Sequence, residues 1–263
     1  GYAKVDSCRV EADIIVEATA EESGSYAGVG GIAGNANRTV QFNGCSFVGS
    51  IQSAVQNVGG ILGATNTMGA QVVNNCYVDA DITGRSKVGG ILGATANKGI
   101  SIANCYVLGS VYATDSYAGG MIGSNGSTDT PATTINNSYV LLSSVTAGNS
   151  TATDTVGPFS ALANTAVNDS YNYYYDGIYI NASKTAETTF PQGDGTVTAE
   201  QALQAATYSN NSWATPWVLT DGKLPYFEYS GEVAIPAYFT GATITAFAAL
   251  APEVANQTIA VGK

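Results

Sequence analysis

Histidine is absent from this chain of 263 residues, and charged side chains are scarce. They make up 11% of the sequence, with 20 acidic against 9 basic residues and a net charge of −11. The lack of histidine and of a C-x-x-C pair argues against a zinc site. The shortage of lysine and arginine argues against nucleic acid as a partner, because phosphates are neutralised by clustered cations.

Long apolar runs and helical periodicity are also missing. No stretch approaches the roughly 18 apolar residues of a membrane span, so we expect a chain that does not cross a membrane. Residues 1–166 show no 3.6-residue pattern of apolar side chains, which excludes a helical fold there.

Glycine, by contrast, is abundant, with 31 residues, and much of it recurs in one six-residue phrase. The step from Gly30 to Gly59 is 29 residues, and the steps to Gly89 and Gly119 are 30 each. A fixed period of this size is typical of a solenoid, in which each unit buries its apolar face against its neighbours. The phrase stands at Val29–Gly34, Val58–Gly63, Val88–Gly93 and Ala118–Gly123.

Each repeat also contains a cysteine column followed by alternating apolar residues. After Cys76, for example, Val78, Ala80 and Ile82 alternate with polar side chains, which indicates a strand with one buried face. Asparagines before each cysteine predict a tight turn into this strand. The sequence therefore predicts an all-β, right-handed parallel β-helix, with a β-sandwich as the less favoured alternative. The column comprises Cys8, Cys45, Cys76 and Cys105, with Ser138 and Ser170 in later units.

The cysteine column allows two interpretations. The first is a buried ladder of small apolar side chains. The second is a disulfide between adjacent repeats, such as Cys76 with Cys105, although directly opposed parallel residues are poorly oriented for one.

The phrases VGGILGAT and NNCYVDADITG resemble the GLUG repeat family, over roughly residues 5–166. The resemblance implies a bacterial surface protein, an adhesin or a part of a secreted peptidase whose catalytic metal domain lies elsewhere. The later phrase TDGKLPYFEY resembles the segment that closes such arrays with a short helix and an aromatic strand. We expect GLUG-type repeats over 1–166, a last rung and cap over 167–231, and the start of an immunoglobulin- or cadherin-like module within 232–263.

A column of tyrosines just after the cysteines is the candidate ligand-binding site. Aromatic rings on a flat sheet can stack on sugar rings or pack against a partner protein. The alternative is that an insertion or the C-terminal segment folds over them. The predicted column consists of Tyr77, Tyr106, Tyr139 and Tyr171.

Acidic side chains form a second candidate site. Glu11 and Asp13 share outward columns with Asp79 and Asp81, two repeats and about 10 Å away. That separation is near the upper end for the two carboxylates of an inverting glycosidase. Solvated surface acids are the favoured interpretation, because no basic residue clearly joins them.

These observations favour a non-catalytic adhesion or binding module, with a glycan or a partner protein as ligand. We expect no cofactor, no metal and no catalytic residues, and a secreted or cell-surface location as part of a longer chain. Two alternatives stay open. One is a carbohydrate-active enzyme of the β-helix type, and the other is a purely structural stalk.

Overall fold

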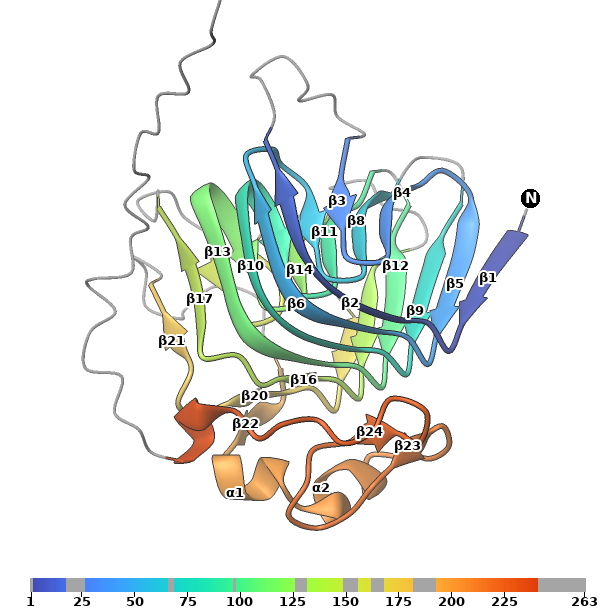
Figure 1. Ribbon diagram of the computed structural model, residues 1–263, viewed down its shortest axis with the longest axis vertical. Coiled ribbons are helices and arrows are strands. Elements are labelled where there is room, and N and C mark those ends of the chain that lie inside the picture. Colours follow the sequence, from blue (N-terminus) through green and yellow to red (C-terminus); the bar gives the residue numbers. More distant parts are fainter. Residues whose placement is uncertain are drawn as a thin grey trace, which may run out of the picture.

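The chain folds as a parallel β-helix in the computed structural model shown in Figure 1, as the repeats predict. The structure describes residues 2–17, 27–65, 69–96, 98–125, 132–148, 156–161, 168–181 and 193–240. Within them, rungs one to four contribute strands to three parallel sheets, and the last two rungs to two of these sheets, around one apolar core. No helix in this part of the chain is long and apolar enough to cross a membrane.

The six-stranded sheet precedes the turn of each rung. Its strands, in spatial order, are β1 (Tyr2–Asp6), β5 (Thr39–Asn43), β9 (Gln71–Asn74), β12 (Ile100–Ala103), β15 (Thr134–Asn136) and β19 (Asn168–Ser170). We number the rungs one to six by these strands.

The twelve-stranded sheet follows the turn. Its main path is β2 (Arg9–Val16), β6 (Ser46–Ser53), β10 (Tyr77–Gly89), β13 (Tyr106–Gly119), β16 (Tyr139–Val140), β20 (Tyr173–Tyr175) and β22 (Gly195–Val197). Joined to it are β3 (Val29–Gly30), β7 (Val58–Gly59), β17 (Ser144–Ala147), β18 (Val156–Gly157) and β21 (Tyr179–Ile180). In rungs three and four, β10 and β13 run without a break to the first glycine of the diglycine.

The four-stranded sheet forms the third side of the solenoid and follows the diglycines. It consists of β4 (Ala33–Ala36), β8 (Leu62–Thr65), β11 (Leu92–Ala94) and β14 (Ile122–Ser124). The bend needs glycine because successive rungs approach closely there. A Cβ atom on Gly60 would lie 2.3 Å from the carbonyl oxygen of Gly90. The fifth rung keeps the first of these glycines, since Gly157 pairs with Gly119 and Pro158 follows it.

The cysteine column forms a ladder at the turn, as the first interpretation predicts, and the four cysteines are free thiols. The N–H of Cys45 donates to Sγ of Cys76, and the N–H of Cys76 donates to Sγ of Cys105, each at 3.4 Å. The ladder continues through the hydroxyl of Ser138. These side chains supply acceptors to backbone groups that the corner would otherwise leave buried without a partner.

The turn contains a left-handed residue in every rung, and in rungs three to five it is an asparagine, as the sequence predicts. In rungs one and two, Ser7 and Gly44 occupy this position. Asn75, Asn104 and Asn137 have φ angles of 50°, 52° and 50°. In rung six this position is occupied by Tyr171, with φ 59°, and Asn172 takes the place expected for Ser170. The repeat alignment of the last rung was therefore wrong by two residues.

The amide of Asn172 explains this register. Its Oδ1 accepts a hydrogen bond from the N–H of Ser138 at 3.0 Å, and its Nδ2 donates to the carbonyl of Ile135 at 2.7 Å. It thus continues the ladder with a larger polar group, and satisfies two buried backbone groups at once.

The C-terminal cap, residues 198–240, packs along the side of the solenoid. It contains α1 (Ala199–Ala202), α2 (Ala205–Ser209), the antiparallel pair β23 (Trp217–Val218) and β24 (Tyr226–Phe227), and the 3₁₀ helix η1 (Ala237–Thr240). Figure 1 shows it beneath the first halves of the long strands. The predicted helix begins at its N-cap Thr198, which forms a capping box with Gln201.

The position of the cap differs from the expectation that it covers the last rung. Tyr229 of the cap donates to the carbonyl of Gly44 in rung two, and Trp213 donates to the carbonyl of Asn137 in rung five. The packing of the cap also continues past residue 231, because Val233 and Phe239 contact the apolar cluster that lies between the cap and the solenoid. The module predicted within 232–263 lies outside the described residues beyond Thr240.

Replacing Gly60 with alanine tests the close approach of the rungs. The new methyl group would meet the carbonyl oxygen of Gly90 at 2.3 Å and Cγ1 of Val78 at 2.6 Å. Since one of these atoms is buried backbone and the other belongs to a buried side chain, we expect the free energy of unfolding to fall by about 3 kcal/mol in urea titrations. The exposed substitution Gln52→Ala is the control, with an expected change within about 0.5 kcal/mol. Equal stability of the two variants would contradict the close packing at the diglycine.

Candidate functional site

The tyrosine column is buried between the solenoid and the cap. Tyr77, Tyr106 and Tyr139 are exposed by 1%, 0% and 0% of their surface. They belong to a second apolar cluster, separate from the core of the solenoid. Besides Val197 of β22, this cluster receives from the cap Ala202, Tyr208, Trp213, Trp217, Leu224 and Phe227.

The rings of the column stack along the solenoid and against the cap. Tyr77 and Tyr106 lie 5.3 Å apart between ring centroids, with an interplanar angle of 7°. Trp217 of the cap contacts both rings, at 6.3 Å and 5.6 Å. Tyr139 meets Tyr208 at 4.8 Å. Such contacts add to the free energy gained from the apolar area that the cap buries.

The phenol groups of the column also donate hydrogen bonds to the cap. Tyr106 donates to the carbonyl of Pro225 at 2.6 Å, and Tyr139 donates to the carbonyl of Thr207 at 2.7 Å. Burial raises the pKa of Tyr106 well above its usual range, and raises that of Tyr139 to about 12. Both hydroxyls therefore stay protonated as donors at neutral pH.

The expected open aromatic surface is therefore corrected. Three of its four tyrosines lie beneath the cap, as the alternative interpretation foresaw, because they offer the apolar area against which the cap packs. The fourth, Tyr171, is 59% exposed but occupies the turn, and Tyr173 takes its place beside Tyr139. Ligand binding at these tyrosines stays an untested prediction, and Tyr171 is the exposed ring among them.

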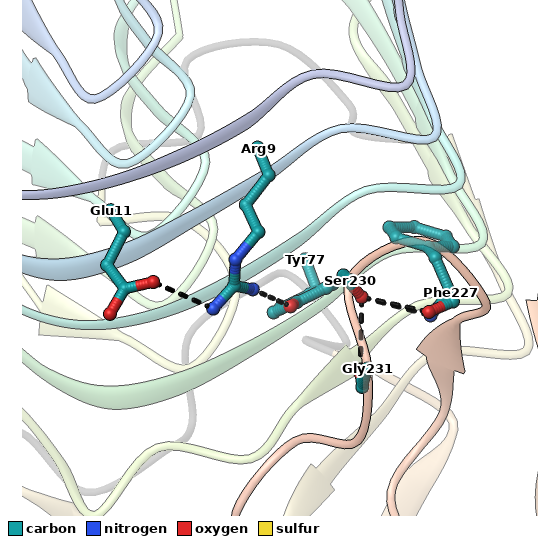
Figure 2. Close-up of polar contacts among 6 residues, drawn as sticks. All are labelled: Arg9, Glu11, Tyr77, Phe227, Ser230 and Gly231. Atoms are coloured by element: carbon teal, nitrogen blue, oxygen red, sulfur yellow. Dashed lines mark hydrogen bonds and ion pairs between the residues drawn. The ribbon is translucent and has the colours of Figure 1, made fainter.

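At rung one, the tyrosine column is followed by Arg9, whose guanidinium contacts Tyr77. Figure 2 shows the guanidinium of Arg9 between the carboxylate of Glu11 and the hydroxyl of Tyr77. Arg9 donates to Tyr77 at 2.6 Å and to Glu11 at 3.2 Å. Because Arg9 and Tyr77 are two rungs apart in register, the long arginine side chain passes over buried Ser46. The sequence pattern gave Arg9 no role, since only the register brings it to Tyr77.

Beside the cap lies an acidic strip, which we define as Glu11, Asp13, Asp79 and Asp81. The predicted columns are confirmed: Glu11 and Asp79 flank Val48, while Asp13 and Asp81 flank Ser50. Glu11, Asp13 and Asp81 are exposed and Asp79 is half-buried. This strip is the part of the long-strand surface that the structure leaves open next to the cap.

Serines hold two carboxylates of the strip in place. Ser50 donates to Oδ1 of Asp13, and Ser110 donates to Oδ1 of Asp81, each at 2.7 Å. Each pair joins neighbouring rungs. The two carboxylates therefore keep a fixed spacing of about 10 Å along the solenoid.

Asp79 has the most perturbed environment in the strip. Burial and, to a smaller extent, the charge of Asp81 raise the pKa of its carboxyl group, and the charge of Arg9 partly opposes them. Nearby, Tyr238 of the cap donates to the carbonyl of Leu141 at 2.7 Å and accepts from the N–H of Gly109. The sequence did not single out Tyr238, because no repeat or motif includes it.

The strip does not form a metal site. No group of three or more His, Cys, Asp or Glu side chains in the described residues is arranged to hold a metal ion. What the strip offers is a rigid row of hydrogen-bond acceptors, serine hydroxyls and one guanidinium.

Comparison with known proteins gives the fold. No family model and no curated protein matches this chain. A solved structure that does match is described as a "putative immunoglobulin A1 protease" from Bacteroides ovatus, with a TM-score of 0.58 and 19% sequence identity. The match covers 87% of this chain and 76% of that chain. At this identity the likeness shows a shared fold alone, and the resemblance to GLUG repeats stays a prediction.

Removing a ring from the buried column should loosen the cap. We expect Tyr106→Ala to lower the free energy of unfolding by about 3–5 kcal/mol, because it removes a fully buried ring. The variant Tyr171→Ala removes an exposed ring, and should change it by less than about 0.5 kcal/mol. Denaturant titration followed by tryptophan fluorescence measures both, and similar losses in the two variants would refute the burial of the column.

The raised pKa of Asp79 predicts that its ionised carboxylate lowers the stability of the fold at neutral pH. A carboxyl group whose pKa is raised by folding favours the folded chain while protonated, below its usual pKa of 3.8, and this contribution is lost as the pH rises through the raised value. Asp79→Asn should therefore increase the urea midpoint at pH 7, with a smaller gain at pH 3. Glu228→Gln, at an exposed position of the cap, is the control for the loss of a surface carboxylate. An Asp79→Asn gain that is equal at both pH values would contradict the burial of this carboxylate.

Proposed function

We propose that this chain is a non-catalytic binding module of a secreted or cell-surface protein, and that it holds a carbohydrate against the acidic strip. The observation that carries the proposal is the register of the strip. Carboxylates and serine hydroxyls alternate along the outward column Asp13, Ser50, Asp81 and Ser110, and Glu11 and Asp79 flank Val48 in the neighbouring outward column.

The chemistry of the strip suits sugar hydroxyl groups. Each carboxylate can accept hydrogen bonds from sugar hydroxyls, while Arg9 supplies donors and the serine oxygens offer further acceptors. The sheet fixes their spacing, so little conformational entropy is lost when a ligand binds. The resemblance to GLUG repeats, which implies a surface protein, an adhesin or a non-catalytic part of a secreted peptidase, supports the same conclusion. The aromatic column does not contribute, since the cap covers it.

A second candidate is a carbohydrate-active enzyme, and one observation favours it. The raised pKa of Asp79 suits a proton donor, and Glu11 lies two rungs away in the same column. Their separation of about 10 Å is near the upper end for an inverting pair, at about 6.5–9.5 Å. The non-catalytic reading is preferred because Glu11 is engaged by Arg9 at 3.2 Å rather than positioned against Asp79.

A polysaccharide and glycan array tests the proposal. We expect the wild-type protein to bind at least one polysaccharide class, and the double variant Asp79→Asn/Asp81→Asn to lose at least ten-fold in affinity. Because Asp79→Asn is expected to stabilise the fold at neutral pH, a loss of binding would not reflect unfolding. Glu228→Gln, an exposed carboxylate outside the strip, is the matched control and should bind like wild type.

Two outcomes would contradict the proposal. If the wild-type protein binds no glycan, the stalk or a protein partner takes its place. If the bound polysaccharide is cleaved, and Asp79→Asn abolishes the cleavage while binding persists, the enzymatic candidate is correct.

A further inference from the structure

The outward column that contains Asp81 continues past the acidic strip and reaches an exposed aromatic ring. From rung three to rung six, the strand register aligns Asp81, Ser110, Ser144 and Tyr179. The side chain of Tyr179, in β21, is 50% exposed. Three rungs separate Asp81 from Tyr179, which corresponds to about 14 Å along the solenoid.

The residues between Asp81 and Tyr179 in this column are small. Ser110 is half-buried, and Ser144 is buried with 4% of its surface exposed. Neither serine projects far above the sheet, so no large side chain of the column stands between the carboxylate and the ring. A ligand that lies along the column therefore reaches both Asp81 and Tyr179.

The border of the cap leaves Tyr179 on the same side as the acidic strip. At rung six the cap covers Tyr175, whose ring lies 4.8 Å from that of Phe239 and whose hydroxyl donates to the carbonyl of Tyr238 at 3.2 Å. Tyr179, further along the same rung, stays open. The border therefore passes between Tyr175 and Tyr179, just as it passes beside Asp79 at rung three.

The backbone around Tyr179 is held in place by the preceding rung. The N–H of Tyr179 donates to the carbonyl of Ser143 at 2.9 Å. Asn181 bonds both backbone groups of Ala147: its Oδ1 accepts from the N–H at 2.9 Å and its Nδ2 donates to the carbonyl at 2.8 Å. Because the base of the ring is fixed on both sides, little conformational entropy is lost when a ligand stacks on it.

An exposed tyrosine ring in line with hydrogen-bonding groups suits a particular kind of sugar chain. The ring packs against C–H groups, and β-linked glucose or xylose presents C–H groups on both faces because its hydroxyls lie at the edge of the sugar ring. Chains joined by β-1,4 bonds are extended and flat, like the sheet surface. Chains that carry uronic acids or sulfates meet like charges at the strip, and like charges placed opposite one another disfavour binding.

We propose that Tyr179 is a sugar-stacking residue of this site, and that the ligand is a linear, uncharged, β-1,4-linked chain of glucose or xylose. The chain runs along the solenoid from Asp81 to Tyr179. This inference rests on the proposed carbohydrate-binding function, and adds to it the class, the direction and the length of the ligand. A disaccharide is too short to touch both residues, whereas an extended hexasaccharide spans them.

Isothermal titration calorimetry with cellohexaose, xylohexaose and the matching disaccharides tests the inference. We expect at least one hexasaccharide to bind, and its disaccharide to bind about ten-fold more weakly because it misses one end of the site. Tyr179→Ala should lower the affinity for that hexasaccharide by about ten-fold through the loss of the stacked ring. The affinity for the disaccharide should fall by less.

Two variants serve as controls. Tyr179→Phe keeps the ring and should bind the hexasaccharide like the wild-type protein. Tyr2→Ala removes a ring that is 55% exposed from β1, which belongs to the six-stranded sheet, and should also leave binding unchanged. Circular dichroism melting curves check that each variant is folded.

Three results would overturn the inference while the proposed function stands, provided that the array shows a bound polysaccharide. They are full hexasaccharide affinity in Tyr179→Ala, equal affinity for the disaccharide and the hexasaccharide, and no binding of either hexasaccharide. If the array shows no bound glycan at all, the proposed function fails first and this inference fails with it.

Discussion

The in-register stacking of successive rungs is the constraint on which the rest of the structure depends. It requires backbones to approach closely at the diglycines, where a Cβ on Gly60 would clash with the carbonyl oxygen of Gly90. It also requires small acceptors at the turn, supplied in turn by thiol, hydroxyl and amide groups. Because the register is fixed, residues one period apart form straight columns. Each outward column therefore acts as a unit, either covered or exposed.

The cap covers some of these outward columns and leaves others exposed. It packs over the tyrosine column, which supplies large apolar rings and phenol donors. These contacts and its hydrogen bonds connect rungs two to five along one side of the solenoid. A solenoid is otherwise held by nearest-neighbour contacts alone. Beside the cap, the acidic strip stays open. The proposed carbohydrate site rests on this strip.

The local pattern was sufficient to predict the fold, because every repeat carries its own turn, strand and bend signals. The inward columns and the left-handed asparagines both follow from residues close in sequence. The register of rung six did not, since Asn172 replaces a cysteine through hydrogen bonds that no simple alternation reveals. Nor did the burial of Tyr106, which depends on a segment more than a hundred residues later. The acidic columns were predictable, but their link to Arg9 and Tyr238 requires the tertiary structure.

Hydroxyl-radical footprinting with mass spectrometry, applied to the intact folded chain, measures the division between covered and open columns most directly. Peptides that carry Tyr77, Tyr106 and Tyr139 should be protected from oxidation, while Tyr171 and Tyr179, exposed by 59% and 50%, should react at the rates of open tyrosines. Oxidation of Tyr106 as fast as that of Tyr171 would mean that the cap does not cover the column. The aromatic face would then again be the leading candidate for the ligand site.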